Sequence, residues 1–181
     1  MATRNILKDG ERTLTKQSRG VTDFNKRLHI LIDDMRETLI EANGLGLAAP
    51  QVGILRRVAL IVDTSIEAEL PEEPTEDELR QHYNEQIIEL VNPEIISCGG
   101  EQTGSEGCLS VPGVYALVTR PNEVAVKAQD RDGNEFILEV SELAARAVCH
   151  EIDHLNGVIF TTVANKILSE EELAEMAEEN R

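Results

Sequence analysis

Hydrophobic positions recur at helical spacing in two segments of the chain. In the first, residues 22–42, Thr22 or Asp23 can cap the start and Asn43-Gly44 can end the helix. In the second, Ser141 can cap the start and Asn156-Gly157 supplies a stop. The apolar positions of the two stripes are Phe24, Leu28, Leu31, Met35, Leu39 and Ala42, and then Leu143, Ala147, Val148, Ile152 and Leu155. We therefore expect two amphipathic helices.

Apolar runs of strand length fill most of the middle of the chain. Residues 58–62 are continuously apolar, which indicates a buried strand, and residues 130–134 carry the Asp-Gly signal of a tight hairpin. Asn92-Pro93 marks an irregularity, residues 97–100 form a turn, and the first twenty residues look irregular, with Ile6-Leu7 as their anchor. The other predicted extended segments are residues 87–96, 114–118, 123–129, 136–140 and 158–162.

Two acidic segments interrupt this pattern. Residues 67–89 are rich in Glu, Asp and Pro, and we interpret them as a solvated insertion with one short helix near 76–83. Residues 169–181 begin with a capping box and predict an acidic C-terminal helix. His29 on the first helix and His82 in the insertion are expected to be surface residues, because no neighbouring residue completes a site.

Length and charge narrow the class of protein. A chain of 181 residues with 41% hydrophobic residues predicts one domain, residues 1–181, with a sizeable core. The net charge of -17 would repel phosphate backbones, so direct nucleic-acid binding is not expected unless a basic face is hidden in the fold. No apolar run reaches the length of a membrane span and the N-terminus lacks a signal peptide, which predicts a cytoplasmic protein whose three cysteines are thiols or metal ligands.

The second helix carries the pattern H-E-x-x-H at residues 150–154. The four-residue offset places His150 and His154 one turn apart on the same face, so both imidazoles can bind one cation. Glu151 lies about 100° round the helix from His150. It would stand beside the metal, where a general acid/base for an activated water is needed.

A catalytic site of this kind needs a third protein ligand and an open position. Cys149 is adjacent to His150 and points away from it around the helix, so it is better placed in the core. Cys98 sits in a glycine-flanked turn with no polar neighbour. Cys108 is preferred, because Gly107 precedes it and an extended chain can follow it. The residues alone leave Cys98 and Cys149 open as alternatives.

A glycine-rich segment, residues 44–53, follows the first predicted helix. It matches the dinucleotide pattern G-x-G-x-x-A, but that pattern needs a strand before it and a helix after it, whereas here a helix precedes the glycines and Pro50 interrupts the segment behind them. Glycines allow the close approach of a ligand backbone, and Gln51 offers an amide donor. An ordinary glycine-rich turn explains the segment equally well.

Three segments together resemble the motifs of the peptide deformylase family. The family patterns G-x-G-x-A-A-x-Q, E-G-C-x-S and H-E-x-D-H are matched in order at residues 44–51, 106–110 and 150–154. The resemblance implies an α+β fold, a compact single domain of small antiparallel sheets around the central metal-binding helix, with a further N-terminal helix and a C-terminal helix. It also implies the removal of formyl from N-formylmethionyl peptides, which makes newly made polypeptides the expected partners.

The resemblance also implies a set of site residues. The metal would be held by Cys108, His150 and His154; family members generally use Fe(II), and zinc, nickel or cobalt can occupy the site. Glu151 would act as general acid/base, and the Gln51 amide and the Leu109 backbone N–H would stabilise the oxyanion. The peptide would contact the Gly46 backbone, and its methionine side chain would lie in an apolar pocket. By position relative to the motifs, the expected walls of that pocket are Leu45, Leu143 and Ala147.

This chain departs from the family pattern in three places. Cys149 stands where the family often has Gln, and the insertion 67–89 is longer than a minimal member needs. Some relatives approach the ribosome with a basic C-terminal helix, but here residues 170–179 are acidic, so ribosome contact would be transient at most and a monomer or weak oligomer is expected.

Two other classes of protein compete with this interpretation. A metalloprotease would use the same H-E-x-x-H chemistry with a downstream His or Glu as third ligand; no histidine follows His154, but glutamates do. A structural zinc module, or a catalytically silent binder of formylated peptides, would need neither Glu151 nor Gln51. A fourth protein ligand such as Cys98 or Cys149 would favour the structural module.

Overall fold

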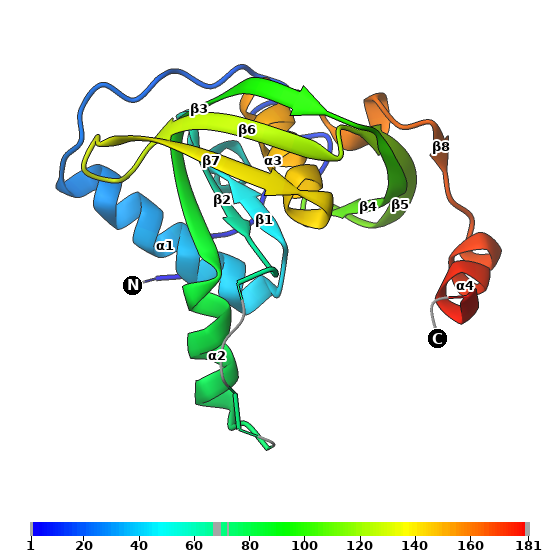
Figure 1. Cartoon of the computed structure of the whole chain (residues 1–181). Coiled ribbons are helices and arrows are strands. Elements are labelled where there is room, and N and C mark those ends of the chain that lie inside the picture. The colour runs from blue at the N-terminus through cyan, green and yellow to red at the C-terminus, as the bar shows by residue number, and fades with distance from the viewer. Residues whose placement is uncertain (1, 67–69, 72, 180–181) are drawn as a thin grey trace.

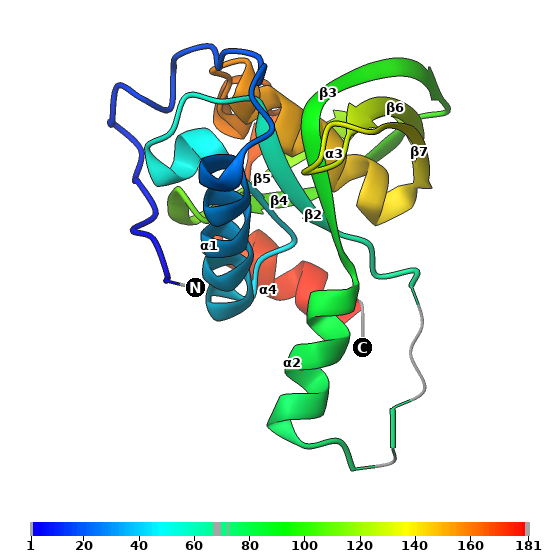
Figure 2. The ribbon, with the colours of Figure 1, turned by 90° about the vertical axis from the view of Figure 1, so that its left-hand side faces the viewer.

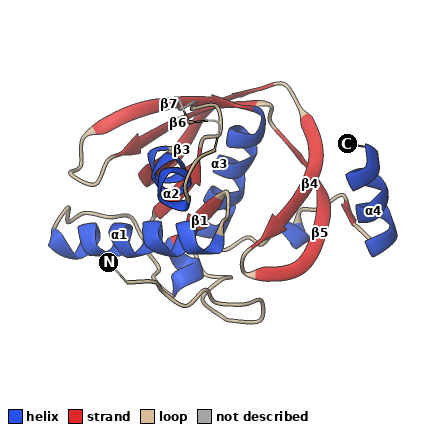
Figure 3. Cartoon of the chain, turned by 90° about the horizontal axis from the view of Figure 1, so that it is seen from below, coloured by secondary structure: helices blue, strands red, loops and turns tan. Residues whose placement is uncertain are grey.

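Two antiparallel sheets enclose one helix in the computed structural model, which describes residues 2–66, 70–71 and 73–179. The helix is α3 (Glu142–Leu155), and it lies between the two sheets in both the front view and the view from below (Figure 1, Figure 3). The larger sheet has the order β1-β2-β3-β6-β7 and the smaller the order β4-β5-β8. The larger sheet contains β1 (Gly46–Ala48), β2 (Val58–Val62), β3 (Ile87–Gly99), β6 (Glu123–Gln129) and β7 (Glu135–Ser141). The smaller contains β4 (Gln102–Cys108), β5 (Val111–Arg120) and β8 (Lys166–Ile167).

Helix α3 is buried on almost every side. It begins after Ser141, as predicted, although the Ser141 hydroxyl makes no capping hydrogen bond, and it ends at Asn156. Its alanines and Val148 pack against the apolar inner face of β6 and β7, which includes Val124 and Val140. A helix enclosed in this way can present polar side chains to an interior site, because its apolar positions already anchor it on the sheet.

Helix α1 (Lys26–Ala42) covers the other side of β1 and β2. It begins later than predicted, since Asn25 is the cap: its side-chain oxygen accepts from the N–H groups of Arg27 at 2.9 Å and Leu28 at 3.3 Å. Of the predicted stripe, Leu28, Leu31, Met35 and Leu39 pack with Ile32 into the same core as Leu47, Leu60 and Val62. Phe24 packs against this core half-buried, and Ala42 is not part of it. The helix ends at Asn43 in the left-handed conformation, as predicted.

In the larger sheet, β2, β3, β6 and β7 follow the predicted apolar runs closely, whereas β1 was not predicted. Every residue of β2 is buried, and the irregularity predicted at Asn92-Pro93 is confirmed by a register shift between Val91 and Glu94, with Asn92 at φ 52°. The turn predicted at residues 97–100 begins later, because β3 continues to Gly99.

The acidic insertion contains the expected short helix. This is α2 (Glu76–Glu85), which starts with a capping box between Thr75 and Glu78 and projects away from the sheets (Figure 1, Figure 2). The insertion ends earlier than predicted, because residues 87–89 belong to β3, in agreement with the predicted strand 87–96. His82 was expected on the surface but is half-buried. Residues 67–69 and 72 of the predicted insertion lie outside the described part of the chain.

The C-terminal segment differs from the prediction in two places, one of which is the unpredicted strand β8 (Lys166–Ile167). Residues 158–162 are not extended: they include the 3-10 helix η2 (Phe160–Thr162), where Phe160 is buried against the smaller sheet. The acidic helix α4 (Glu170–Glu179) forms as predicted and lies outside the two-sheet body beyond β8 (Figure 1, Figure 3); residues 180–181 lie outside the described residues.

The described residues before Asn25 form no helix, and their only bridge is an isolated one between Arg19 and Arg56, which agrees with the predicted irregular segment. The anchoring of this segment extends further than Ile6-Leu7. Leu14 is fully buried and packs with Val111 and Phe160. His29 was predicted on the surface but is half-buried, with its Nε2 2.9 Å from the Arg131 carbonyl. In the part of the chain that the structure describes, no helix combines the length and apolar character needed to cross a bilayer.

Candidate active site

Cys108, His150 and His154 converge at the end of β4. One ligand atom from each lies within 4.8 Å of the others, and the Cys108 sulfur is 3.2 Å from Nε2 of His154. Among the described residues this is the one group of three or more potential ligands arranged to hold a metal ion. A thiolate with two imidazoles suits several divalent transition metals. Cys108 reaches the histidines because the register of the β4–β5 hairpin shifts after Gly107, which turns the end of β4 toward α3.

Glu106 fixes the orientation of the first histidine. Its Oε2 lies 3.0 Å from Nδ1 of His150. Because burial is outweighed by hydrogen bonds from His150 and Arg120, the pKa of Glu106 is lowered to about 2. An ionised carboxylate can only accept, so Nδ1 carries a proton and Nε2 is the nitrogen left to bind a cation. Burial is outweighed by hydrogen bonds with Cys108 and Glu106, which raise the pKa of His150 to about 10, so a cation bound at Nε2 would displace a proton.

Two buried arginines neutralise Glu106. Arg120 donates from Nε to Oε1 at 2.9 Å and from Nη2 to Oε2 at 3.0 Å, and Arg146 donates from Nη1 to Oε1 at 2.9 Å. Arg146 also donates to the Val118 carbonyl at 2.9 Å, and Arg120 to Asp153 at 2.6 Å. The network therefore ties α3 to both β4 and β5, and it leaves no charge of Glu106 unpaired.

His154 is the more deeply buried imidazole. It is 1% exposed, and burial, with the positive charges of its neighbours, lowers its pKa to about 3, so it is neutral at physiological pH. Its Nδ1 has no hydrogen-bond partner among the described residues. A neutral imidazole with Nε2 facing the Cys108 sulfur fits a metal ligand.

Glu151 stands beside the three potential ligands and lines a cavity that Cys108 and His150 also line. It is 3% exposed, and burial raises its pKa to about 7. A Cβ placed on Gly46 would lie 2.3 Å from Oε1 of Glu151, so the carboxylate occupies space that only glycine leaves open. A carboxyl group poised near neutrality can both accept and return a proton.

Gln51 presents its amide nitrogen to the site. It lies in the 3-10 helix η1 (Ala49–Val52), and its Oε1 accepts from the Ala48 N–H at 2.8 Å. Its Nε2 is therefore directed inward, 3.6 Å from the Cys108 sulfur and 3.2 Å from the Ser110 hydroxyl. Leu109 follows Cys108 directly and lines the same cavity.

One cavity of about 550 Å³ opens onto these groups. The residues predicted to form the pocket all lie in its lining: Leu45 and Leu143 are 42% and 43% exposed, and Ala147 is buried. Gly46 lines the cavity as well. These three side chains give the cavity an apolar part of its lining, and Glu151 lines the same cavity.

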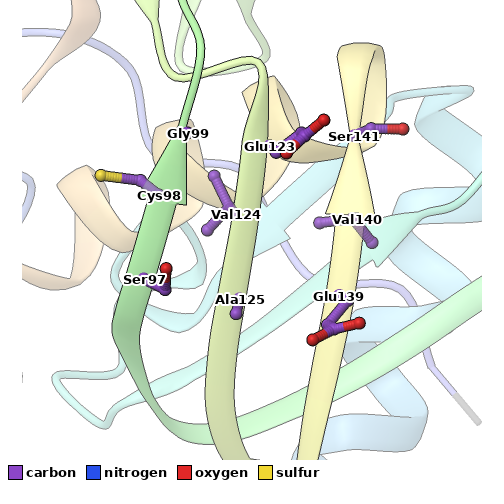
Figure 4. Close-up of a pocket in the computed structure, with 9 residues that line it drawn as sticks. All are labelled: Ser97, Cys98, Gly99, Glu123, Val124, Ala125, Glu139, Val140 and Ser141. Atoms are coloured by element: carbon purple, nitrogen blue, oxygen red, sulfur yellow. The ribbon is translucent and has the colours of Figure 1, made fainter.

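The other two cysteines lie elsewhere. Cys149 is buried in the core on α3, and burial raises its pKa to about 11, which favours the inert thiol. Cys98 is exposed on β3 and lines a separate cavity of about 430 Å³ over the ends of β3, β6 and β7 (Figure 4). Neither belongs to the group formed by Cys108, His150 and His154.

Sequence reasoning missed the groups that support the site. Glu106 and Asp153 stand inside the quoted motifs, so their positions were a signal for a role that was not assigned. Arg120 and Arg146 gave no such signal, because each meets Glu106 only through folding, 14 and 40 residues away along the chain.

Comparisons with known proteins agree with this geometry. The family model described as polypeptide deformylase matches residues 3–170. A peptide deformylase of Caldicellulosiruptor bescii is 49% identical over 173 residues, covering 96% of this chain and 92% of the relative. The crystal structure of a peptide deformylase from Legionella pneumophila superposes with a TM-score of 0.78 at 36% identity, covering 99% of this chain and 98% of that one. A Met-Ala-Ser-bound class I type b peptide deformylase from Acinetobacter baumannii gives a TM-score of 0.75 at 32% identity, covering 90% and 98%.

Proposed function

Because the chain belongs to the polypeptide deformylase family, we propose the roles of its own residues in deformylation. The reaction is a metal-dependent hydrolysis that removes the formyl group from the N-terminus of newly made polypeptides. The observation that carries the proposed roles is the convergence of Cys108, His150 and His154 beside a buried carboxylate, Glu151.

Cys108, His150 and His154 would hold the metal ion. Support comes from the contact of His150 Nδ1 with Glu106, which leaves Nε2 for the ion, from the neutral His154 and from the closeness of the three ligand atoms. A bound ion would supply Lewis acidity, which makes water a competent nucleophile at neutral pH. We propose Fe(II) as the resident ion from the family resemblance; Zn(II), Ni(II) and Co(II) suit the same donors.

Glu151 would act as the general acid/base. It would accept a proton from the attacking water at its carboxylate and return that proton to the amine that leaves with the peptide. Its raised pKa, caused first by burial, supports this exchange, because a carboxyl group with an ordinary pKa of about 4.3 returns protons poorly at neutral pH. Positive charge at the metal site would lower this pKa and favour the base form.

Gln51 and Leu109 would stabilise the negative charge that develops on the formyl oxygen. The Gln51 amide nitrogen is held toward the site by the hydrogen bond between its oxygen and Ala48. The Leu109 N–H follows Cys108 directly, so its position depends on the same turn of β4. Donors fixed before the reaction need no reorganisation when charge develops, and loss of one costs about 10²- to 10³-fold in kcat.

The peptide would lie along the cavity with its first side chain between Leu45, Leu143 and Ala147. Gly46 would offer its backbone to the peptide backbone in the manner of an added strand. The relative from Acinetobacter baumannii that was crystallised with Met-Ala-Ser supports a methionine-first peptide as ligand. Formyl carries only hydrogen on its carbonyl carbon, so a narrow site can admit it and exclude larger acyl groups.

Newly made chains occur in the cytoplasm, and we place the reaction there. Contact with the ribosome would be transient, because α4 carries acidic residues throughout its first turn. We propose a monomer or weak oligomer, a single domain over residues 1–181, and no direct binding to nucleic acid or membrane.

Two variants test the roles directly. Glu151→Gln keeps the shape of the side chain and should retain the metal while formate release from formyl-Met-Ala-Ser falls by at least about 10²-fold. Cys108→Ala should lose both metal and activity. Metal content and formate are measured on proteins purified without oxygen, with wild type and Gly20→Ala, a remote exposed position, as references. An active Glu151→Gln protein would contradict the role of Glu151, and a metal-loaded Cys108→Ala protein the role of Cys108.

A further inference from the structure

The outer edge of β1 faces the cavity and is held at two points. Strand β1 pairs with β2 on one side only, so it is an edge strand. The Val62 N–H donates to the Leu45 carbonyl at 2.9 Å, which directs the backbone of Leu45 toward β2. Because backbone groups alternate along a strand, those of Gly46 and Ala48 point outward, and Gly44 lies just before the strand, beyond a bend at Leu45. The Gln51 side chain accepts from the Ala48 N–H at 2.8 Å and fixes one end of this outer edge.

The other end is fixed by the acidic insertion. The hydroxyl of Tyr83, on the last turn of α2, donates to the Gly44 carbonyl. The Tyr83 ring is half-buried against the core that contains α1, β1 and β2. Burial raises the pKa of Tyr83 to about 12, so the hydroxyl keeps its proton and remains a donor at physiological pH. The backbone of Gly46, which faces outward, therefore lies between two residues whose backbone groups are anchored, Gly44 and Ala48.

Gly44 also connects this contact to the reacting groups. A Cβ at Gly44 would lie 2.8 Å from Cδ1 of Leu109, and a Cβ at Gly46 would lie 2.3 Å from Oε1 of Glu151. The backbone of β1 therefore lies directly against both side chains.

Helix α2 is itself anchored away from the cavity. Arg36 on α1 donates from Nη1 to the carbonyl of Asn84 at 2.8 Å and to its Oδ1 at 3.1 Å. Arg36 also donates from Nη2 to Glu89 at 2.7 Å, at the start of β3. These bonds hold the end of α2 on α1 beside Tyr83. A further pair, Arg80 with Glu37, joins the two helices on the exposed side and contacts no cavity residue.

We propose that Tyr83 is a positioning residue that sets the outer edge of β1 for the peptide backbone through its bond to Gly44. The acidic insertion then has a role in substrate binding although none of its described residues lines the cavity. This inference rests on the proposed use of Gly46 by the peptide.

Tyr83→Phe removes only the hydroxyl and is the variant of choice. We expect the KM for formyl-Met-Ala-Ser to rise about 5- to 30-fold, the range for a buried acceptor left without its donor, while kcat changes less than about twofold. KM should carry the loss because contacts to the peptide backbone are made equally in the ground and transition states. Arg80→Met is the matched control: it also weakens the contact of α2 with α1, but it leaves Gly44 bonded, and its KM should match wild type.

Backbone hydrogen exchange supplies a measurement that does not depend on activity. Amides of residues 45–48 should exchange at least about fivefold faster in Tyr83→Phe and at the wild-type rate in Arg80→Met. Unchanged KM and unchanged exchange in Tyr83→Phe would overturn the proposal, as would equal effects in Arg80→Met, which would show that docking of α2 alone matters. A wild-type protein that released no formate would contradict the proposed catalytic roles, and the exchange data would still decide the role of Tyr83.

Discussion

Replacing Glu106 by Gln should destabilise the protein more than any surface carboxylate could. Each oxygen of Glu106 accepts two hydrogen bonds, from Arg120 and Arg146 at one oxygen and from Arg120 and His150 at the other, at 2.9 to 3.0 Å. A glutamine keeps one acceptor oxygen and turns the second into an NH2 group that faces two donors. The change removes the negative charge that the two buried arginines, Arg120 and Arg146, contact.

Two routes give the magnitude of the loss. Lowering the pKa of Glu106 from 4.5 to about 2 corresponds to about 3 kcal/mol at 1.36 kcal/mol per pKa unit. Breaking a buried ion pair by removing one partner costs about 3 to 5 kcal/mol. We therefore expect the free energy of unfolding at pH 7 to fall by about 3 to 5 kcal/mol, measured by urea denaturation of metal-free protein. Glu135→Gln, which loses an exposed pair with Lys127, should change it by less than about 1 kcal/mol.

The pH dependence has a defined sign. The folded pKa of Glu106 lies below the unfolded value, so its contribution is complete above pH 4.5 and is lost as pH falls through about 2. The difference between wild type and Glu106→Gln should consequently narrow by about 2 kcal/mol between pH 7 and pH 3. A variant within about 1 kcal/mol of wild type at pH 7 would refute the idea that Glu106 is held as a buried, fully paired carboxylate.

Further predictions concern Gly46, Glu151 and the metal. Gly46→Ala forces Glu151 or β1 to move by about 1 Å and should lower kcat at least about 10²-fold, with metal content unchanged and Gly20→Ala fully active. In metal-free protein the raised pKa of Glu151 lowers the free energy of unfolding as pH rises from 4.5 to about 7. Glu151→Gln should therefore be about 3 kcal/mol more stable to unfolding than wild type at pH 8 and show no gain below pH 4.5. Equal stability of the two proteins at both pH values would contradict the burial of this carboxylate. Removing the metal with a chelator should lower Tm, since an ion at 1,000 times its Kd adds about 4 kcal/mol, and scanning calorimetry with and without chelator measures the shift.

The elements that the sequence predicts best are those whose signal is local. Helix α3 and strand β2 have an apolar period or run that fits one structure only, and both form where expected. Strand β1 was missed because three residues carry too little pattern, and its strand conformation depends on pairing with β2. The 3-10 helix at Phe160 was missed for a related reason: its burial against the smaller sheet decides its shape.

The candidate site divides in the same way. His150, Glu151 and His154 follow from helical spacing, which fixes their relative positions before the rest of the chain folds. The residues alone only favoured Cys108 as the third ligand, and the family resemblance was needed to assign it. The β4–β5 hairpin brings Cys108 to α3 across a separation of 46 residues from His154, which no local pattern reveals. The pairing of Glu106 with two arginines, and of Tyr83 with Gly44, depends on tertiary contacts that no local pattern encodes.

X-ray absorption at the metal edge, on protein purified without oxygen, tests the central claim most directly. If Cys108, His150 and His154 hold the ion, the first coordination shell contains one sulfur and two imidazole nitrogens, at about 2.3 Å and about 2.0 to 2.1 Å for zinc, and one position remains for a light atom of water. The sulfur should disappear in Cys108→Ala. A wild-type shell without sulfur, with two sulfurs, or with a fourth protein ligand would contradict the account.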